Sequence, residues 1–262
     1  MTLGAIDIVG FLIGLNAGVL GGLVGIGGGM VMIPLMVAFL RMGQHQAHGT
    51  SLFAVVFTGL VGAVTYALHG SVNHFAAAVL AITAGVMAAV GARYTQRLSE
   101  NMLRRTFGFF LVAMSALMLA KPYLPVFAAF SVTGWAGITI LLMSGTLIGF
   151  LAGLMGVGGG GIMIPVLVLL MGMNQYMAQG TSLAAMVPPA VVGSWTHRRL
   201  GNVRKDVLLF LVAGVLLGTF LGGAVAHLVP ERELRVIFSL VILWVGIRDV
   251  RSSYMRQRLG DG

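Results

Sequence analysis

Glycine and hydroxyl residues recur in this chain in a pattern that suits the binding of a small anion. The stretch Gly25–Pro34 reads G-I-G-G-G-M-V-M-I-P, and Gly156–Pro165 reads G-V-G-G-G-G-I-M-I-P. Each is followed by Gly-Thr-Ser-Leu, at Gly49–Leu52 and at Gly180–Leu183. Backbone N–H groups freed by glycine breaks, and the N-terminal ends of helices, favour negatively charged ligands. We therefore expect these stretches to form an anion cradle.

The candidate ligand groups come in pairs, one from each half of the chain. Threonine and serine hydroxyls can donate to a ligand or cap the first turn of their own helix, and the sequence leaves both open. Each glutamine before a Gly-Thr-Ser element can close a pocket or be a plain loop residue. The substrate-binding candidates are Gly27, Gly28, Gly29, Thr50, Ser51, Gly158, Gly159, Gly160, Thr181, Ser182, Gln44 and Gln175.

Acidic residues are scarce in the predicted membrane-spanning segments. Between Asp7 and Asp206 the only acid is Glu100, in a predicted loop. Ionisable residues within the membrane commonly mark proton relays or ion pathways. Their absence argues against proton antiport through Asp or Glu and against a cation substrate, so it favours an anion. The membrane potential, worth about 2.3 kcal/mol per charge per 100 mV, can then drive anion export.

Other residues that carry chemistry are absent or scattered. There is no cysteine, which excludes disulfides and thiolate metal sites. The six histidines are expected in or near loops, with a proton-handling role for His48 as a minor alternative. The glycine runs lack the Gly-Lys-Ser/Thr of a phosphate-binding loop. We expect no metal and no cofactor.

The composition indicates an integral membrane protein. The chain is 58% hydrophobic and 9% charged, whereas a soluble domain carries about 25% charged residues. The net charge is +9, but the basic residues lie in short loops and at the C-terminus, where they indicate topology. We expect an all-α polytopic protein in a lipid bilayer, with no nucleic-acid partner.

The two glycine runs belong to an internal duplication. They lie 131 residues apart, and Gly18–Val72 aligns on Gly149–Val203 without a gap, with close to half the positions identical. Such a match indicates two copies of one unit. We expect a first repeat over residues 1–125 and a second over residues 126–262, forming one membrane domain.

Each glycine run should interrupt a membrane helix. Glycine costs about 1 kcal/mol relative to alanine in a helix interior, and Pro34 and Pro165 should bend or cap the short segment that follows. Freed backbone groups are tolerated at membrane depth only inside protein or beside a cavity. Paired breaks in two halves are the best sequence indication of a transporter binding site.

Apolar runs near the spanning length of about 20 residues alternate with shorter ones. We predict segments over Ile6–Val24, Met30–Leu40, Thr50–Leu68, Phe75–Arg93, Leu103–Ala120, Gly134–Met155, Ile162–Met171, Thr181–Arg198, Val207–Val229 and Leu234–Ile247. Pro188 and Pro189 should kink the eighth segment. Counting each glycine-broken pair as one helix gives eight spans rather than ten, and both counts stay open.

Basic residues predict the orientation, because Lys and Arg in short loops mark the cytoplasmic side. They cluster in residues 93–105, 198–205 and 248–258, and we place all three regions in the cytoplasm. Corresponding loops of the two halves then lie on opposite sides of the membrane. This predicts inverted repeats, glycine breaks near the midplane and a cytoplasmic C-terminus.

The paired G-x-G-G-G…P cores, the Gly-Thr-Ser elements and the duplication resemble the TauE/SafE family of membrane permeases, often called sulfite exporters. The resemblance covers nearly the whole chain. It implies a multi-spanning transporter of the bacterial inner membrane for sulfite, thiosulfate, sulfonates or related small anions. It does not identify the anion or the direction of transport.

Two other classes compete with an anion carrier. An anion-selective channel with a glycine-lined pore would differ from a carrier by showing neither saturation nor counterflow. A membrane-embedded enzyme, such as a lipid phosphatase, needs Glu, Arg or His clusters at membrane depth, which the predicted spans lack, so we expect no enzyme. The oligomeric state stays open between a monomer and a homodimer.

Overall fold

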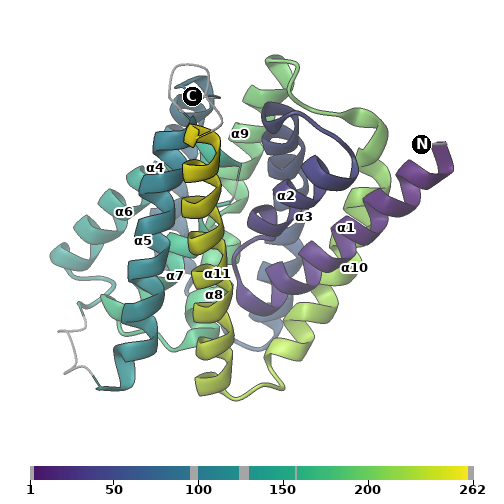
Figure 1. The fold of residues 1–262 in the computed structure, drawn as a ribbon. Coiled ribbons are helices and arrows are strands. Elements are labelled where there is room, and N and C mark those ends of the chain that lie inside the picture. The colour runs from purple at the N-terminus through teal and green to yellow at the C-terminus, as the bar shows by residue number, and fades with distance from the viewer. Residues whose placement is uncertain (1–2, 95–99, 124–129, 157, 259–262) are drawn as a thin grey trace.

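The computed structural model describes residues 3–94, 100–123, 130–156 and 158–258, which form helices joined by short loops, without a strand in these ranges (Figure 1). The helices of the first half are α1 (Leu3–Val24), α2 (Gly29–Phe39), α3 (Gln44–Leu68), α4 (His74–Tyr94) and α5 (Glu100–Ala120). A 3-10 turn, η1 (Lys121–Tyr123), follows. The second half contains α6 (Trp135–Met155), α7 (Gly160–Leu169), α8 (Gln175–Ala185), α9 (Val187–Arg199), the 3-10 turn η2 (Lys205–Val207), α10 (Leu208–Ala226) and α11 (Glu231–Arg258).

Five helical stretches are long and apolar enough to cross a membrane: Ile6–Val24, Gln44–Leu68, His74–Tyr94, Trp135–Met155 and Lys205–Ala226. Shorter apolar helices include α2 and α7, whose residues Met32 and Ile164 are fully buried. A polytopic, all-α membrane protein is therefore confirmed. The two short helices that follow the glycine runs belong to its interior.

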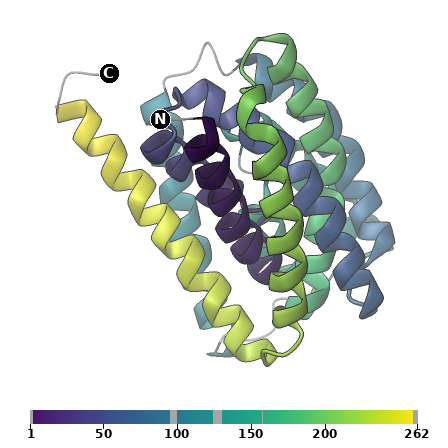
Figure 2. The same ribbon diagram turned by 90° about the vertical axis from the view of Figure 1, so that its right-hand side faces the viewer.

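The first helix of each half packs against the last helix but one of the other half: α1 against α10, and α6 against α4. A Cβ added to Gly14 of α1 would lie 2.1 Å from the carbonyl oxygen of Leu211 in α10. A Cβ on Gly149 of α6 would lie 2.2 Å from the carbonyl oxygen of Ala84 in α4. Small residues let membrane helices approach this closely. Figures 1 and 2 both show α1 lying beside α10.

The last helix of each half forms a third pair. The Ser115 hydroxyl of α5 donates to the Ser239 carbonyl of α11 at 2.8 Å. Glycines 108 and 246 allow close contact, because a Cβ on either would lie 2.8 Å from the carbonyl oxygen of the other. Figure 2 shows α11 as a long diagonal helix at the outside of the bundle. All three pairs therefore join one half of the chain to the other.

Two helices begin earlier than predicted. Gln44 starts α3 and Gln175 starts α8, so the expectation that helices begin at Thr50 and Thr181 is wrong. Asn174 caps α8, where its side chain accepts a hydrogen bond from the backbone N–H of Met177 at 2.8 Å. The Gly-Thr-Ser elements consequently lie inside helices, and their hydroxyls do not mark helix N-termini.

The proline positions and two further predicted segments can be compared with the observed helices. The helix is interrupted just before Pro188 and Pro189, where a kink was predicted: α8 ends at Ala185 and α9 begins at Val187. Pro34 and Pro165 lie inside α2 and α7. The predicted segments Leu103–Ala120 and Leu234–Ile247 are parts of α5 and α11, so Glu100 begins a helix instead of lying in a loop.

Because α11 extends beyond the predicted segment, it includes a buried acidic residue. Asp249 lies within this helix and is 5% exposed, so an acid does stand inside a helix. It is paired with Arg248, whose Nη2 lies 2.6 Å from Oδ1 of Asp249. Among the basic residues used for orientation, Arg97 lies outside the described residues, as does the side chain of Arg104.

Candidate functional site

The two glycine breaks touch each other inside the protein. The φ angles are +80° at Gly27 and +73° at Gly28, and +79° at Gly158 and +86° at Gly159. Glycine is the residue that adopts this left-handed conformation without strain. A Cβ on Gly160 would lie 2.6 Å from Cα of Ile26. The start of α7 therefore rests on the first break.

Two apolar side chains fill the space between the breaks. A Cβ on Gly27 would lie 2.6 Å from Sδ of Met186 and 3.4 Å from Cγ1 of Val55. One on Gly158 would lie 3.0 Å from the same Val55 atom and 3.5 Å from the same Met186 atom. Both side chains are fully buried. Sequence reasoning missed them, although they occupy equivalent positions in the duplication.

Each short helix begins at a glycine break without a side-chain cap. Gly28 precedes α2 and Gly159 precedes α7, and neither position provides a capping hydrogen bond from a side chain. Helix N-termini carry free N–H groups and a partial positive charge. The first turns of α2 and α7 therefore lack a side-chain cap, and anion binding by Gly27–Gly29 and Gly158–Gly160 stays a prediction.

The serines of the Gly-Thr-Ser elements bind the glycine break of the opposite half. The Ser51 hydroxyl lies 2.8 Å from the carbonyl oxygen of Gly156 and 2.9 Å from that of His48, so its one proton is shared between these acceptors. Ser182 donates to the carbonyl of Gly25 at 3.3 Å. The structure therefore brings both serines to the breaks. Their hydroxyl protons are used to hold the halves together.

The threonines bind loops of the opposite half. The Thr50 hydroxyl accepts a hydrogen bond from the backbone N–H of Arg204 at 3.1 Å. The Thr181 hydroxyl accepts one from the backbone N–H of Asn73 at 2.9 Å. Both threonines are fully buried. The two contacts correspond to each other under the duplication, and neither caps the threonine's own helix.

We expect Thr181→Val to lower the free energy of unfolding by about 1–2 kcal/mol, because it leaves the N–H of Asn73 without its acceptor. Thr181→Ser keeps the hydroxyl and should unfold close to the wild type. Chemical denaturation of the purified protein in detergent micelles measures both. Equal stability of the valine and serine variants would contradict a structural role for this hydroxyl.

Two further polar pairs link the halves at equivalent positions. The Tyr66 hydroxyl lies 2.7 Å from Oε1 of Gln179 and 3.0 Å from the carbonyl oxygen of Gly22, so its one proton is shared between these acceptors. His197, 131 residues after Tyr66, places Nε2 3.2 Å from the carbonyl of Gly153. His48 lies in α3 and is 6% exposed. His48 and His197 therefore lie near loops, as expected, His197 in the last turn of α9. Their burial inside the protein was not anticipated.

The two candidate glutamines stand at the starts of helices. Gln44 begins α3, and Gln175 begins α8 with its side chain fully buried. The backbone N–H of Gln175 donates to Glu231 of α11 at 3.1 Å. This contact places Gln175 against α11, and no hydrogen bond within the described residues joins it to a glycine break.

One charged side chain near a break was not anticipated. Nη1 of Arg248 on α11 donates to the carbonyl of Met30 in the first turn of α2, at 3.3 Å. The neighbouring Asp249 neutralises this arginine. Within the described part of the chain, no group of three or more His, Asp or Glu residues is placed to hold a metal ion. Separately, a groove of about 520 Å³ between α4 and α9 is lined by Arg93, Trp195 and Arg199 among others.

A known family matches most of this chain. The family profile "Sulfite exporter TauE/SafE" matches residues 10–248. The chain belongs to the TauE/SafE family. TauE/SafE proteins are membrane transporters and not enzymes, so the resemblance seen in the glycine cores is confirmed.

The curated relatives of this TauE/SafE protein are described mainly as transporters. The chain is 28% identical over 260 residues to the probable membrane transporter protein YunE of Bacillus subtilis, covering 90% of this chain and 94% of the relative. It is 26% identical over 256 residues to a probable membrane transporter protein of Haemophilus influenzae, covering 90% and 95%. A shorter match, 29% over 119 residues, is to Sulfite exporter TauE/SafE family protein 5 of Arabidopsis thaliana, covering 43% of this chain and 26% of that protein. No solved structure matches the chain significantly.

Proposed function

We propose that this TauE/SafE protein carries a small sulfur-containing or organic anion, such as sulfite, thiosulfate or a sulfonate, out of the cell across the bacterial inner membrane. The single observation that carries this proposal is the meeting of two helix N-termini, each preceded by a glycine break and neither capped by a side chain. A small oxyanion supplies the acceptors that such N–H groups require. The substrate cradle comprises Gly27–Gly29 and Gly158–Gly160, with the Gly-Thr-Ser elements behind them.

The cradle is built by two repeats, residues 1–125 and 126–262, which we propose are inverted relative to each other in the membrane. Reciprocal contacts support this arrangement: α1 packs on α10 as α6 packs on α4, and Ser51 binds Gly156 as Ser182 binds Gly25. Inverted repeats of this kind place a broken-helix site near the midplane and alternate its access between the two sides. The basic ends of the chain favour a cytoplasmic C-terminus.

The breaks are in contact through Val55 and Met186, which suggests how the cradle closes. Val55 lies on α3, and Met186 lies directly after α8. The serines and threonines of these two helices bind the opposite half of the chain. Separating the halves would move these two side chains apart and expose the helix N-termini. This motion is the step by which we expect an anion to enter.

Counterflow in proteoliposomes tests the function. We expect labelled thiosulfate or sulfite to enter vesicles that contain the unlabelled anion, with a rate that saturates. An inside-negative potential should speed net efflux from vesicles, since each charge gains about 2.3 kcal/mol per 100 mV. A flux that rises linearly with concentration and shows no counterflow would favour the alternative of a glycine-lined, anion-selective channel.

A further inference from the structure

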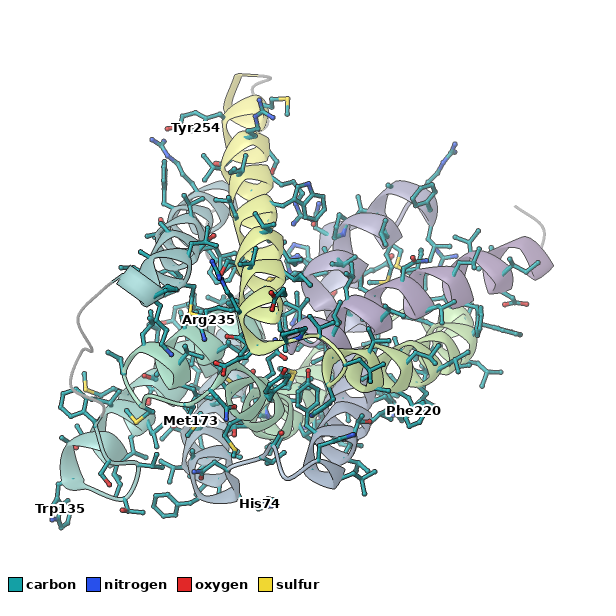
Figure 3. All side chains as sticks on the ribbon, turned by 90° about the horizontal axis from the view of Figure 1, so that it is seen from below. His74, Trp135, Met173, Phe220, Arg235 and Tyr254 are labelled. Atoms are coloured by element: carbon teal, nitrogen blue, oxygen red, sulfur yellow. The ribbon has the colours of Figure 1, made fainter. Side chains whose placement is uncertain are left out.

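A cluster of polar side chains lies where α8 begins against α11; we call Lys121, Gln175, Glu231 and Arg235 the α8–α11 cluster. Oε1 of Glu231 accepts hydrogen bonds from Nη2 of Arg235 at 2.7 Å and from the backbone N–H of Gln175 at 3.1 Å. One carboxylate oxygen therefore joins the first turns of two helices. Figure 3 views this end of the protein, with Arg235 labelled on α11.

Two donors in the α8–α11 cluster are buried without an acceptor. Gln175 is 0% exposed, and neither its Nε2 nor its Oε1 has a hydrogen-bond partner among the described residues. The same holds for Nε of Arg235, whose side chain is 16% exposed. Native proteins pair nearly all their buried polar atoms, with protein, water or a bound ligand. The unpaired donors, Nε2 of Gln175 and Nε of Arg235, thus indicate a bound molecule that offers acceptor oxygens.

The charge balance of the cluster is positive. Lys121 of η1 is half-buried, and burial is the main cause of a lowered pKa of its amine. The positive charge of Arg235 lowers this pKa further, while Glu231 raises it. Two cations therefore share one carboxylate. Water alone could fill the hydrogen bonds, but it would leave this excess charge unbalanced.

We propose that the α8–α11 cluster binds a small oxyanion, held by Nε2 of Gln175, Nε of Arg235 and the ammonium of Lys121. No hydrogen bond among the described residues joins this cluster to a glycine break, so we treat it as a second anion site, where α8 begins. The inference rests on the proposed function in taking the transported sulfur anions as the ligand class. Guanidinium and amide donors around the N-terminus of α8 suit a tetrahedral oxyanion.

The duplication repeats the core of this site. The same three residue types stand 131 residues earlier, at Gln44, Glu100 and Arg104. Gln44 begins α3 as Gln175 begins α8, and Glu100 begins α5 as Glu231 begins α11. Inverted repeats would put these two sets on opposite sides of the membrane. Each end of the transport path would then carry one set, where an anion enters or leaves.

Protection of Lys121 from an amine-reactive succinimidyl ester provides a readout at this site. Lys121 and Lys205 are the lysines of the chain, so Lys205 serves as an internal reference in the same sample. We expect thiosulfate or sulfate to slow modification of Lys121 by roughly fivefold or more, because a bound anion covers the amine and favours its charged form. Labelling of Lys205 should not change. Peptide mass spectrometry of the purified full-length protein measures both, against sodium chloride at equal ionic strength.

Two variants and two matched controls test the assignment. Gln175→Leu and Arg235→Gln should each abolish the protection of Lys121. Gln46→Leu and Arg232→Gln remove exposed residues of the same types and should keep it. A cooperative melting transition measured without anion confirms that each variant is folded. If one of the two variants does not fold, the other alone tests the site. Protection that persists in a folded Gln175→Leu or Arg235→Gln protein would overturn the site.

Counterflow in the same preparations separates this inference from the proposed function. Wild-type exchange of thiosulfate without protection of Lys121 would refute the second site and leave the carrier intact. Protection without any exchange would support the site and refute the carrier. Loss of protection in both variants, with protection kept in both controls, is the result that supports the α8–α11 site.

Discussion

Replacing Gly180 with alanine is expected to prevent this protein from folding. A Cβ at this position would lie 2.1 Å from the carbonyl oxygen of Ser71 and 2.7 Å from Cβ of Tyr66. The first of these atoms is backbone, so α8 and the loop after α3 must separate by more than a rotamer change can provide. Overpacking commonly costs about 1–3 kcal/mol, and we expect a backbone clash to reach the top of that range or exceed it.

The yield of monodisperse protein in size-exclusion chromatography, with the Tm of whatever folds, measures this effect. Gly49→Ala should behave in the same way, because its Cβ would lie 2.3 Å from the carbonyl oxygen of Asn202. Gly43→Ala is the matched control, since nothing lies within 4 Å of the added atom. A Gly180→Ala protein that melts like Gly43→Ala would show that α8 does not approach the loop this closely.

Replacing Gly158 with alanine is expected to abolish transport while leaving a folded protein. Its φ of +79° costs alanine about 1–2 kcal/mol. The added methyl would meet side chains rather than backbone, with Cγ1 of Val55 at 3.0 Å and Sδ of Met186 at 3.5 Å. These side chains can yield, but the methyl then occupies the space where the two helix N-termini present their N–H groups.

Gly201→Ala is the matched control for the backbone strain alone. Gly201 has a φ of +75° and nothing within 4 Å of an added Cβ. We expect the two variants to lose similar stability, and Gly158→Ala alone to lose roughly tenfold or more of the counterflow rate. Equal counterflow rates in Gly158→Ala and Gly201→Ala would show that the glycine breaks take no part in transport. Gly27→Ala extends the test to the first half.

The sequence predicted the importance of four hydroxyl residues but not their partners. Thr50, Ser51, Thr181 and Ser182 were identified from their repetition, and each does lie in a contact between the halves. Their partners were not predictable, because each partner is more than 100 residues away and belongs to the other repeat. For the same reason, the burial of His48 and His197 and the placement of Val55 and Met186 between the breaks were missed.

The α8–α11 cluster illustrates the same limit. Gln175 was singled out as the equivalent of Gln44, yet its partner Glu231 falls between the predicted segments Val207–Val229 and Leu234–Ile247. A carboxylate that caps the first turn of another helix has no local sequence pattern. The recurrence of Gln, Glu and Arg at one spacing in both halves was the signal that could have found it.

By itself, the sequence determined that this is an all-helical membrane protein with two copies of a glycine-broken segment, because hydropathy and the backbone freedom of glycine are properties of single residues and short runs. It also determined the family, through the same glycine cores. Only the tertiary structure decided that the breaks touch, that α3 and α8 start before their Gly-Thr-Ser elements, and that α1 pairs with α10. Those features depend on contacts between residues far apart in the chain, where the close approach of two backbones selects the arrangement.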